Sequence, residues 1–592
     1  MERFHLFSPR FWPPRPLEPR ESFLYFTWTI GFWTCFSGEP LKKRLIRLVT
    51  VFCLAVLLGP AGSMAASPVV GAERSRNLRQ LDYAPMLLEY HAQTVGEGRA
   101  FFTYPRRNYD FREQVRRESA KALIAFGNGL DAAGGSSSAA GSSLTDGSTN
   151  AAGSSPTENK HSFAILASPV FGIDYRGTEA MNDTVWPGFD GGLYLRGFAD
   201  SIDFDLDARI YAESHTAGST DGDKRKPQSY DGEVFDVQHE DRGGVDYVSY
   251  ARYRAHLGLN YAFFRLQLAR DVLHWGPGYY NNLTLNQFAL PYNMIALDVV
   301  FGPLRVYSAY ADLRVNSWSY SKDNLNDRNM YAHRYELALG NLTVGMSELQ
   351  ILYNENKPWL FTPVVPLFIE KGNYTERVNN GALSFDIDYR LFRMLRLYGE
   401  FLLDDMESPY AVYENRYSNN RWAGMLGMHF AQNLSVAQRP VQVGSIAEIA
   451  RVEPYTYCHY DTARAQMAHL GRPLGNPNGP NSLAVDWTLY TQFRVFPLAA
   501  TFQATNQATF QAAGGPGTIF LGLHNKWLWK GVDAGSSIDD PYKTVEKRFV
   551  HGAPLVYTIA PSFSYQGRFV SFMGELTFGD EAGAYLRTSF VW

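Results

Sequence analysis

The sequence predicts an all-β transmembrane barrel of about 18 antiparallel strands, within a range of about 16 to 20, preceded by a small N-terminal helical periplasmic element. Three observations predict this fold class. Long segments alternate strictly between apolar and polar residues, the composition is rich in aromatic residues and poor in charge, and the chain ends on an aromatic residue. Aromatic residues make up 15% and charged residues 19% of the 592 residues, whereas soluble domains carry about 25% charged residues.

The charge balance and the cysteine count exclude two classes. With 55 Lys and Arg against 59 Asp and Glu, the net charge is −4, so electrostatics gives no reason to expect a nucleic-acid partner. Three cysteines in a chain of this length exclude a disulfide scaffold.

The N-terminal region has the features of an export signal. A basic group at 42–44 precedes a short apolar run at 48–58, and Ser63 and Ala65 form a small-residue cleavage site. A transmembrane anchor is the alternative, but the apolar run is shorter than the roughly 20 residues that a spanning helix needs. We therefore expect residues 1–40 to be an untranslated or removed extension and 41–65 to be a cleaved signal peptide.

The next two segments differ in composition from the rest of the chain. Residues 66–131 are expected to be a periplasmic N-terminal segment containing one helix at Tyr109–Asn128, where apolar residues follow a partial helical period. Residues 132–160 are rich in Ala, Gly and Ser, which is typical of a flexible linker. The barrel is predicted to occupy residues 161–592.

Within that range the alternation is long enough to cross a membrane. In 202–210 the even positions are apolar and the odd positions are charged, and the same period recurs in 251–260, 383–390 and 485–494. A β-strand needs about 9 to 11 residues to cross a membrane, whereas the strands of soluble sandwiches usually have about 5 to 6 residues. At about 24 residues per strand and its connection, the predicted barrel region holds some 18 strands.

Charged residues in the middle of these strands are expected to line a polar lumen as ion pairs. Those expected to face inward are Arg252, Arg254, Arg265, Arg270, Arg305, Arg334, Arg390, Arg396, Glu336, Asp386, Asp388 and Glu400. The last segment alternates up to Trp592 and is similar to the terminal strand that the bacterial barrel-assembly machinery recognises. The sequence therefore predicts a bacterial outer-membrane location, with membrane lipid and this machinery as partners.

Several motifs occur in an order that carries a family resemblance. Trp275-Gly276-Pro277-Gly278 follows Arg270-Asp271 and precedes a Leu-rich stretch ending at Pro291. Later come Gly345–Glu348, Asn379-Asn380, Leu397–Asp405, and a glycine-rich stretch at Gly471–Gly475 and Gly479–Ser482. In this order the motifs resemble those of the Wzi family of capsule-assembly outer-membrane barrels.

The resemblance implies a function in attaching capsular polysaccharide or exopolysaccharide to the cell surface. A porin or a substrate-specific channel is the alternative, because alternation alone predicts a barrel and does not predict what fills it. Neither alternative identifies the glycan.

A candidate polysaccharide-binding site lies where the strand ending at Asp271 meets the Trp-Gly-Pro-Gly turn. Sugar recognition needs aromatic faces and planar polar groups. The residues that offer these groups are Arg270, Asp271, His274, Trp275, Tyr279, Tyr280 and Asn282. The alternative interpretation is that the aromatic residues belong to the girdles found in every such barrel.

We expect no enzyme, no cofactor and no metal site. Six histidines are formal candidates for catalysis, but none lies in a motif that pairs it with a nucleophile: His256, His274, His333, His429, His459 and His524. His459 lies next to Cys458, but one cysteine and one histidine make a poor metal site.

The predicted processing can be tested on protein purified from the outer membrane. Because the cleavage site ends at Ala65, the mature chain should begin near Ala66. N-terminal sequencing or mass spectrometry checks this. Recovery of residues 1–40 in the mature protein would contradict both the cleavage and the predicted start.

Overall fold

The structure is a computed structural model, and all the residues it describes lie within Val69–Trp592, the second of the two compact units into which the chain divides. The described residues are 124–126, 163–178, 183–184, 188–216, 233–240, 245–261, 263–314, 328–373, 379–391, 394–405, 420–436, 439–495, 517–541, 547–566, 570–580 and 583–591. The predicted signal peptide and linker lie outside them.

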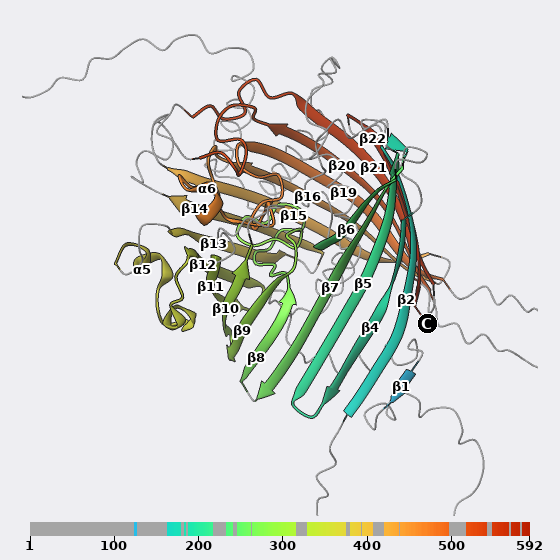
Figure 1. The fold of residues 1–592 in the computed structure, drawn as a ribbon, viewed down its shortest axis with the longest axis horizontal. Coiled ribbons are helices and arrows are strands. Elements are labelled where there is room, and N and C mark those ends of the chain that lie inside the picture. Colours follow the sequence, from blue (N-terminus) through green and yellow to red (C-terminus); the bar gives the residue numbers. More distant parts are fainter. Residues whose placement is uncertain are drawn as a thin grey trace, which may run out of the picture. The chain divides into compact units, whose positions relative to one another are not determined.

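The described strands form one large antiparallel sheet of 21 strands and a separate two-stranded ribbon (Figure 1). The 18 long strands of the sheet are β2 (Phe163–Thr178), β4 (Gly188–Ala199), β5 (Ile202–Thr216), β7 (Val245–Tyr261), β8 (Phe264–Asp271), β9 (Tyr292–Phe301), β10 (Leu304–Leu313), β11 (Arg328–Leu339), β12 (Leu342–Tyr353), β13 (Asn379–Leu391), β14 (Leu395–Asp405), β15 (Arg421–Val436), β16 (Arg439–Val452), β19 (Ser482–Val495), β20 (Gly517–Lys530), β21 (Leu555–Gln566), β22 (Val570–Gly579) and β23 (Gly583–Val591). The remaining three, β1 (Ile124–Phe126), β3 (Asp183–Thr184) and β6 (Glu233–Glu240), are additions to its edges. The ribbon consists of β17 (Ala468–His469) and β18 (Arg472–Pro473).

The 18 long strands close into a ring. Each pairs antiparallel with the next long strand along the chain. The last strand, β23, then pairs with the first, β2, with Val591 opposite Val170 and Gly583 opposite Thr178. Closure leaves no unpaired edge to face lipid, which a membrane-spanning sheet requires. The predicted antiparallel barrel of about 18 strands is confirmed.

The two faces of the ring differ as the alternation predicts. On β5, Asp203 is 2% exposed, whereas Ile210 is 59% exposed on the other face. Most of the predicted inward charges form buried pairs, such as Arg265 with Asp203 at 2.8 Å and Arg305 with Asp298 at 2.9 Å. Apolar side chains thus point outward and charged ones line the lumen, as an outer-membrane barrel requires.

One predicted inward charge points the other way. Arg270 lies on the same face of β8 as Leu266 and Leu268, which are exposed. Its guanidinium lies 4.4 Å from the centre of the Tyr253 ring on the neighbouring strand. The prediction that Arg270 faces inward is therefore wrong. Successive side chains of a strand point to opposite faces, so the position of a residue along the strand, and not its charge, fixes its direction. A cation–π contact with Tyr253 stabilises the charge there.

Most short connections lie at one end of the strands and most long ones at the other; the exceptions are the long connection from β19 to β20 and the short one from β22 to β23. The turns after β4, β7, β9 and β11 are short, whereas the connections after β8, β12, β16 and β20 are long. Outer-membrane barrels have short periplasmic turns and longer extracellular loops. We therefore call the end with the long connections the outer end.

Most of the predicted N-terminal helix lies outside the described residues, and the three residues that are described form a strand. Within Tyr109–Asn128, only Ile124–Phe126 is described, and it forms strand β1, which pairs with β2 at 165–167. Strand β23 pairs with β2 only from Val170 onward, so β1 pairs with the edge that β23 leaves free. An unpaired strand edge favours such an addition. None of the described helices is long and apolar enough to cross a membrane.

Removing 590–592 should prevent the barrel from closing. Phe590 and Val591 pair with β2, and a lost pairing leaves backbone groups facing lipid at several kcal/mol each. Full-length protein should migrate differently in boiled and unboiled gel samples, and the truncated protein should lose this difference. H551A, which changes an exposed histidine outside the strands, serves as the control. Truncated protein that reaches the membrane with the same gel shift would contradict the closure.

Candidate functional site

The connection between β8 and β9, residues 272–291, folds into the ring instead of extending beyond it; we call it the lumen loop (Figure 1). Nearly all of its side chains are buried, and they share one apolar cluster with residues of β9, β10, β14, β16 and β19. The backbone N–H of Trp275 donates to the C=O of Leu285 at 3.0 Å, which closes the loop on itself.

Glu448 of β16 holds the middle of the lumen loop. One carboxylate oxygen accepts the backbone N–H of Tyr279 at 2.6 Å. The other accepts the N–H groups of Tyr280 and Asn281, each at 3.0 Å. The hydroxyl of Tyr398 also donates to Glu448 at 2.8 Å. These donors satisfy a carboxylate that is fully buried, and without them its burial would cost several kcal/mol.

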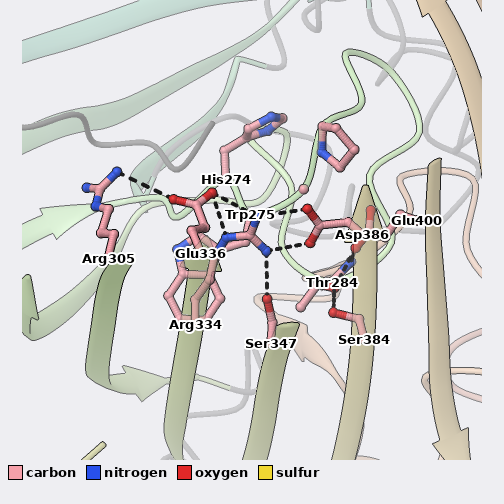
Figure 2. Close-up of polar contacts among 12 residues, drawn as sticks. His274, Trp275, Thr284, Arg305, Arg334, Glu336, Ser347, Ser384, Asp386 and Glu400 are labelled. Atoms are coloured by element: carbon pink, nitrogen blue, oxygen red, sulfur yellow. Dashed lines mark hydrogen bonds and ion pairs between the residues drawn. The ribbon is translucent and has the colours of Figure 1, made fainter. Parts of the chain in front are cut away.

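Glu400 of β14 holds the next part of the loop in the same way (Figure 2). It accepts the backbone N–H of Leu283 at 2.8 Å and that of Thr284 at 3.0 Å. The hydroxyl of Thr284 donates to Glu400 and also lies 2.5 Å from the hydroxyl of Ser384. Two wall carboxylates therefore accept five of the six consecutive loop amides at 279–284, all but that of Asn282.

The Trp-Gly-Pro-Gly motif fits this close approach. Gly276 has a φ of +120°, and a Cβ at this position would lie 2.6 Å from a carboxylate oxygen of Glu400. Only glycine avoids both the strain and the clash. The C=O of Pro277 accepts a hydrogen bond from Arg396 at 2.7 Å, and Arg396 also pairs with Asp388. The motif is thus a structural element that seats the loop against the wall.

A network of charges lies in the wall beside the loop (Figure 2). Arg334 pairs with Asp386 at 2.7 Å and with Glu336 at 2.9 Å, and it donates to the hydroxyl of Ser347 at 2.8 Å. All four side chains are buried. Because each charge has an opposite partner, the network fixes the faces of β11, β12 and β13 against which the loop packs.

A second loop, residues 453–481 between β16 and β19, packs on the first. The hydroxyl of Tyr457 donates to the C=O of Leu283 at 2.8 Å, and the N–H of Asn286 donates to the C=O of Leu474 at 2.7 Å. This loop contains the glycine-rich stretch at 471–482 and the short helix α6 (Thr462–Ala465). Two sequence motifs almost 200 residues apart therefore meet inside the ring.

Five of the seven predicted binding residues are buried: Asp271, His274, Trp275, Tyr279 and Asn282. Trp275 is 0% exposed and its ring lies against the edge of Tyr307, so it is not a girdle residue. Asn282 donates to the His274 ring at 2.9 Å, and Tyr279 bonds to His429 at 2.7 Å. In this conformation these side chains hold the loop together and offer no free face to a sugar.

The other two predicted residues are partly exposed and lie apart. Arg270 points outward from β8 and contacts Tyr253. Tyr280 stacks on the ring of His524 at 4.7 Å, and its hydroxyl bonds to Thr488 at 2.7 Å. The structure therefore does not bring the seven residues to one surface, and a role for each in binding polysaccharide stays a prediction.

The buried groups of the loops are held neutral. Burial, with Arg334 and Arg396 nearby, lowers the pKa of His274 to about 3, so this ring is uncharged at neutral pH. Burial raises the pKa of the Cys458 thiol, which makes it a poor nucleophile. No group of three or more His, Cys, Asp or Glu side chains within the described part of the chain could hold a metal ion.

Sequence reasoning missed the role of Glu448. It is a single carboxylate in an otherwise apolar and small-residue stretch of its strand, at 445–450, and such an isolated charge is a signal for a specific partner. Its partners are backbone amides 167 to 169 residues away in the sequence, and the side-chain pattern carries no information about them.

No protein-family model matches the chain, and neither does any curated protein. Solved structures similar to it include Wzi of Escherichia coli, described as an outer-membrane protein involved in group 1 capsule assembly and as a carbohydrate-binding β-barrel. That likeness has 13% identity and a TM-score of 0.44, and it covers 72% of this chain and 84% of that one. OpdO of Pseudomonas aeruginosa has 12% identity and a TM-score of 0.37, covering 72% and 96% of the two chains. The outer-membrane protein OpdK of the same organism has 9% identity and a TM-score of 0.34, covering 72% and 98%.

The protein's own architecture gives its class. A closed antiparallel ring, an apolar outer face and a charged lumen are together the features of a bacterial outer-membrane β-barrel.

Replacing Glu448 by glutamine should loosen the lumen loop. The glutamine side chain keeps one acceptor oxygen, but its NH₂ group would face backbone N–H donors and cannot accept from them. A hydrogen bond to a charged group, which this change removes, contributes about 1.5 to 3 kcal/mol. Amide hydrogen exchange in 279–281, measured by mass spectrometry, should therefore become about 10-fold faster or more in E448Q. E453Q is the matched control, because the Glu453 side chain contacts Arg451 instead of the loop. Exchange that is equally slow in E448Q and the wild type would contradict the role of Glu448.

Proposed function

We propose that this barrel binds surface polysaccharide, capsular or secreted, at its outer end and helps to attach it to the cell. The observation that carries the proposal is the lumen loop, which Glu448 and Glu400 fix inside the ring. A lumen occupied by a fixed, buried loop suits a platform for a polymer better than a path for solutes. Membrane lipid and the barrel-assembly machinery remain its proposed partners, and the chain is proposed not to be an enzyme.

The second loop carries exposed groups suited to sugars. Tyr460 is 55% exposed, and its ring lies 4.1 Å from that of His459. Arg464 pairs with Asp461 at 3.2 Å and lies over the ring of Tyr353 at 5.0 Å. An open aromatic face beside planar charged groups can stack on a sugar ring and bind its hydroxyls or carboxylates. We propose Tyr460 and Arg464 as contact residues, supported from below by the lumen loop.

One observation favours the alternative, a channel. On the opposite side of the ring, inward charges of β5 and β7 are only partly buried: Asp205, Asp207, Arg209, Arg254 and His256. A wall of partly exposed charges is also what a pore for small charged solutes would need.

Deletion of the protein should release polysaccharide from the cell. If the barrel attaches the polymer, cell-bound polysaccharide should fall and free polysaccharide in the medium should rise, while the total stays similar. The amounts are measured in the cell and medium fractions. An unchanged distribution would contradict the proposal and leave the channel as the better interpretation.

Changing Tyr460 and Arg464 to alanine together should weaken binding of the polymer to purified protein. An aromatic face contributes about 0.5 to 1.5 kcal/mol and a charged hydrogen bond about 1.5 to 3, so affinity should fall about 10-fold or more. H551A, which alters an exposed histidine on another outer loop, is the control. Equal affinity of the double variant and the control would exclude this contact site.

A further inference from the structure

The connection between β12 and β13 covers part of the outer wall of the ring; we call its described part, residues 354–373, the strap. It contains the short helices η4 (Pro358–Phe361) and α5 (Leu367–Asn373), and α5 lies beside β12 and β13 (Figure 1). The strap is fixed to outward-facing residues of three strands. The Ser308 hydroxyl donates to the C=O of Phe361, and Leu367 N–H donates to Glu348 at 2.8 Å. The Tyr335 hydroxyl donates to the C=O of Pro363 at 2.5 Å.

Beneath the strap, the outer wall is polar at membrane height. His333, Glu348 and Gln350 lie on the same face as Leu337 and Val344, which are exposed in the outward belt. Glu348 and Gln350 are the seventh and ninth residues of a strand of 12 residues. Because crossing the apolar layer takes about 9 to 11 residues, both lie within the height of the membrane. Facing lipid directly, a carboxylate there would be strongly unfavourable.

Between Pro358 and Ile369 the exposed side chains of the strap are apolar except for Thr362, and Asn354 and Asn356 are exposed at its start. Val364 is 83% and Ile369 60% exposed, and Trp359 and Phe368 are exposed beside them. The charged pair near the start of the strap, Lys357 with Glu355, is closed at 2.7 Å. On its inner side the strap packs Leu360 and Leu367 against Tyr331 and Leu352 and bonds to the polar groups of the wall. Its large exposed side chains, which point away from the wall, are apolar.

We propose that the strap is embedded in the outer leaflet of the membrane, with the acyl chains of lipid as the partner of its exposed apolar side chains. It replaces the apolar surface that β10, β11 and β12 lack at this height, and it continues the belt formed by Leu337 and Val344. This continuity favours lipid over a second copy of the chain, since the same belt surrounds the ring. The strap shields Glu348, His333 and Gln350 from lipid.

The proposal is tested by fluorescence quenching in phospholipid vesicles that contain the full-length protein. Cys35, Cys53 and Cys458 are replaced by alanine, and a bimane label is placed at V364C. Two further single-cysteine variants serve as references: L337C in the lipid-facing belt and Y460C on an outer loop. Quenching by nitroxide-labelled lipid and by aqueous iodide is measured for each, at several ratios of protein to lipid.

The label at position 364 should behave like that at 337: quenched by the nitroxide lipid to the same extent, and protected from iodide. Quenching by iodide as at position 460 would place the strap in water and overturn the proposal. Protection from both quenchers that disappears when the protein is diluted with lipid would identify a second copy as the partner, and would also overturn it. The gel shift of unboiled samples confirms that each variant is folded.

Discussion

The position of the lumen loop depends on the pairing of two buried wall carboxylates with the amides of the loop. Glu448 and Glu400 are buried, and so are all but Tyr280 of the five loop residues whose amides they accept. Burying the carboxylates without the amides, or the amides without the carboxylates, would be costly, because an unsatisfied buried polar group costs about 1 to 3 kcal/mol. Together they satisfy each other. The glycine of the Trp-Gly-Pro-Gly turn, the contact of Arg396 with Pro277 and the packing of the second loop all follow from this close approach.

Much of the fold could be predicted because it follows from local chemistry. A period of two residues over nine or more positions gives long strands with two faces, and their number follows from the length of the region. The pairing of β23 with β2 could be anticipated from the alternation that ends at Trp592. The reversed direction of Arg270 and the strand at Ile124–Phe126 could not, because each depends on a neighbouring strand.

The structure arranges the predicted binding residues differently from what the composition suggested. Composition marked Trp275 and Tyr279 as possible sugar platforms, and the structure buries both in the lumen. The difference arises because the loop turns inward, and that turn depends on Glu448 and Glu400, which come from strands far along the chain. The strap shows the same effect on the outer face: Glu348 follows the outward parity of its strand, and a connecting segment decides what it faces. Alternation predicts the direction of a side chain, and the loops determine its surroundings.

The central claim is that the two glutamates hold the lumen loop in place and so restrict the lumen. The most direct measurement is the single-channel conductance of the purified full-length barrel in a planar bilayer, compared with that of the double variant E400Q/E448Q. The account predicts low, steady conductance for the wild type and larger, fluctuating conductance for the variant, because the released loop no longer occupies the lumen. Equal conductance in the two proteins would contradict it.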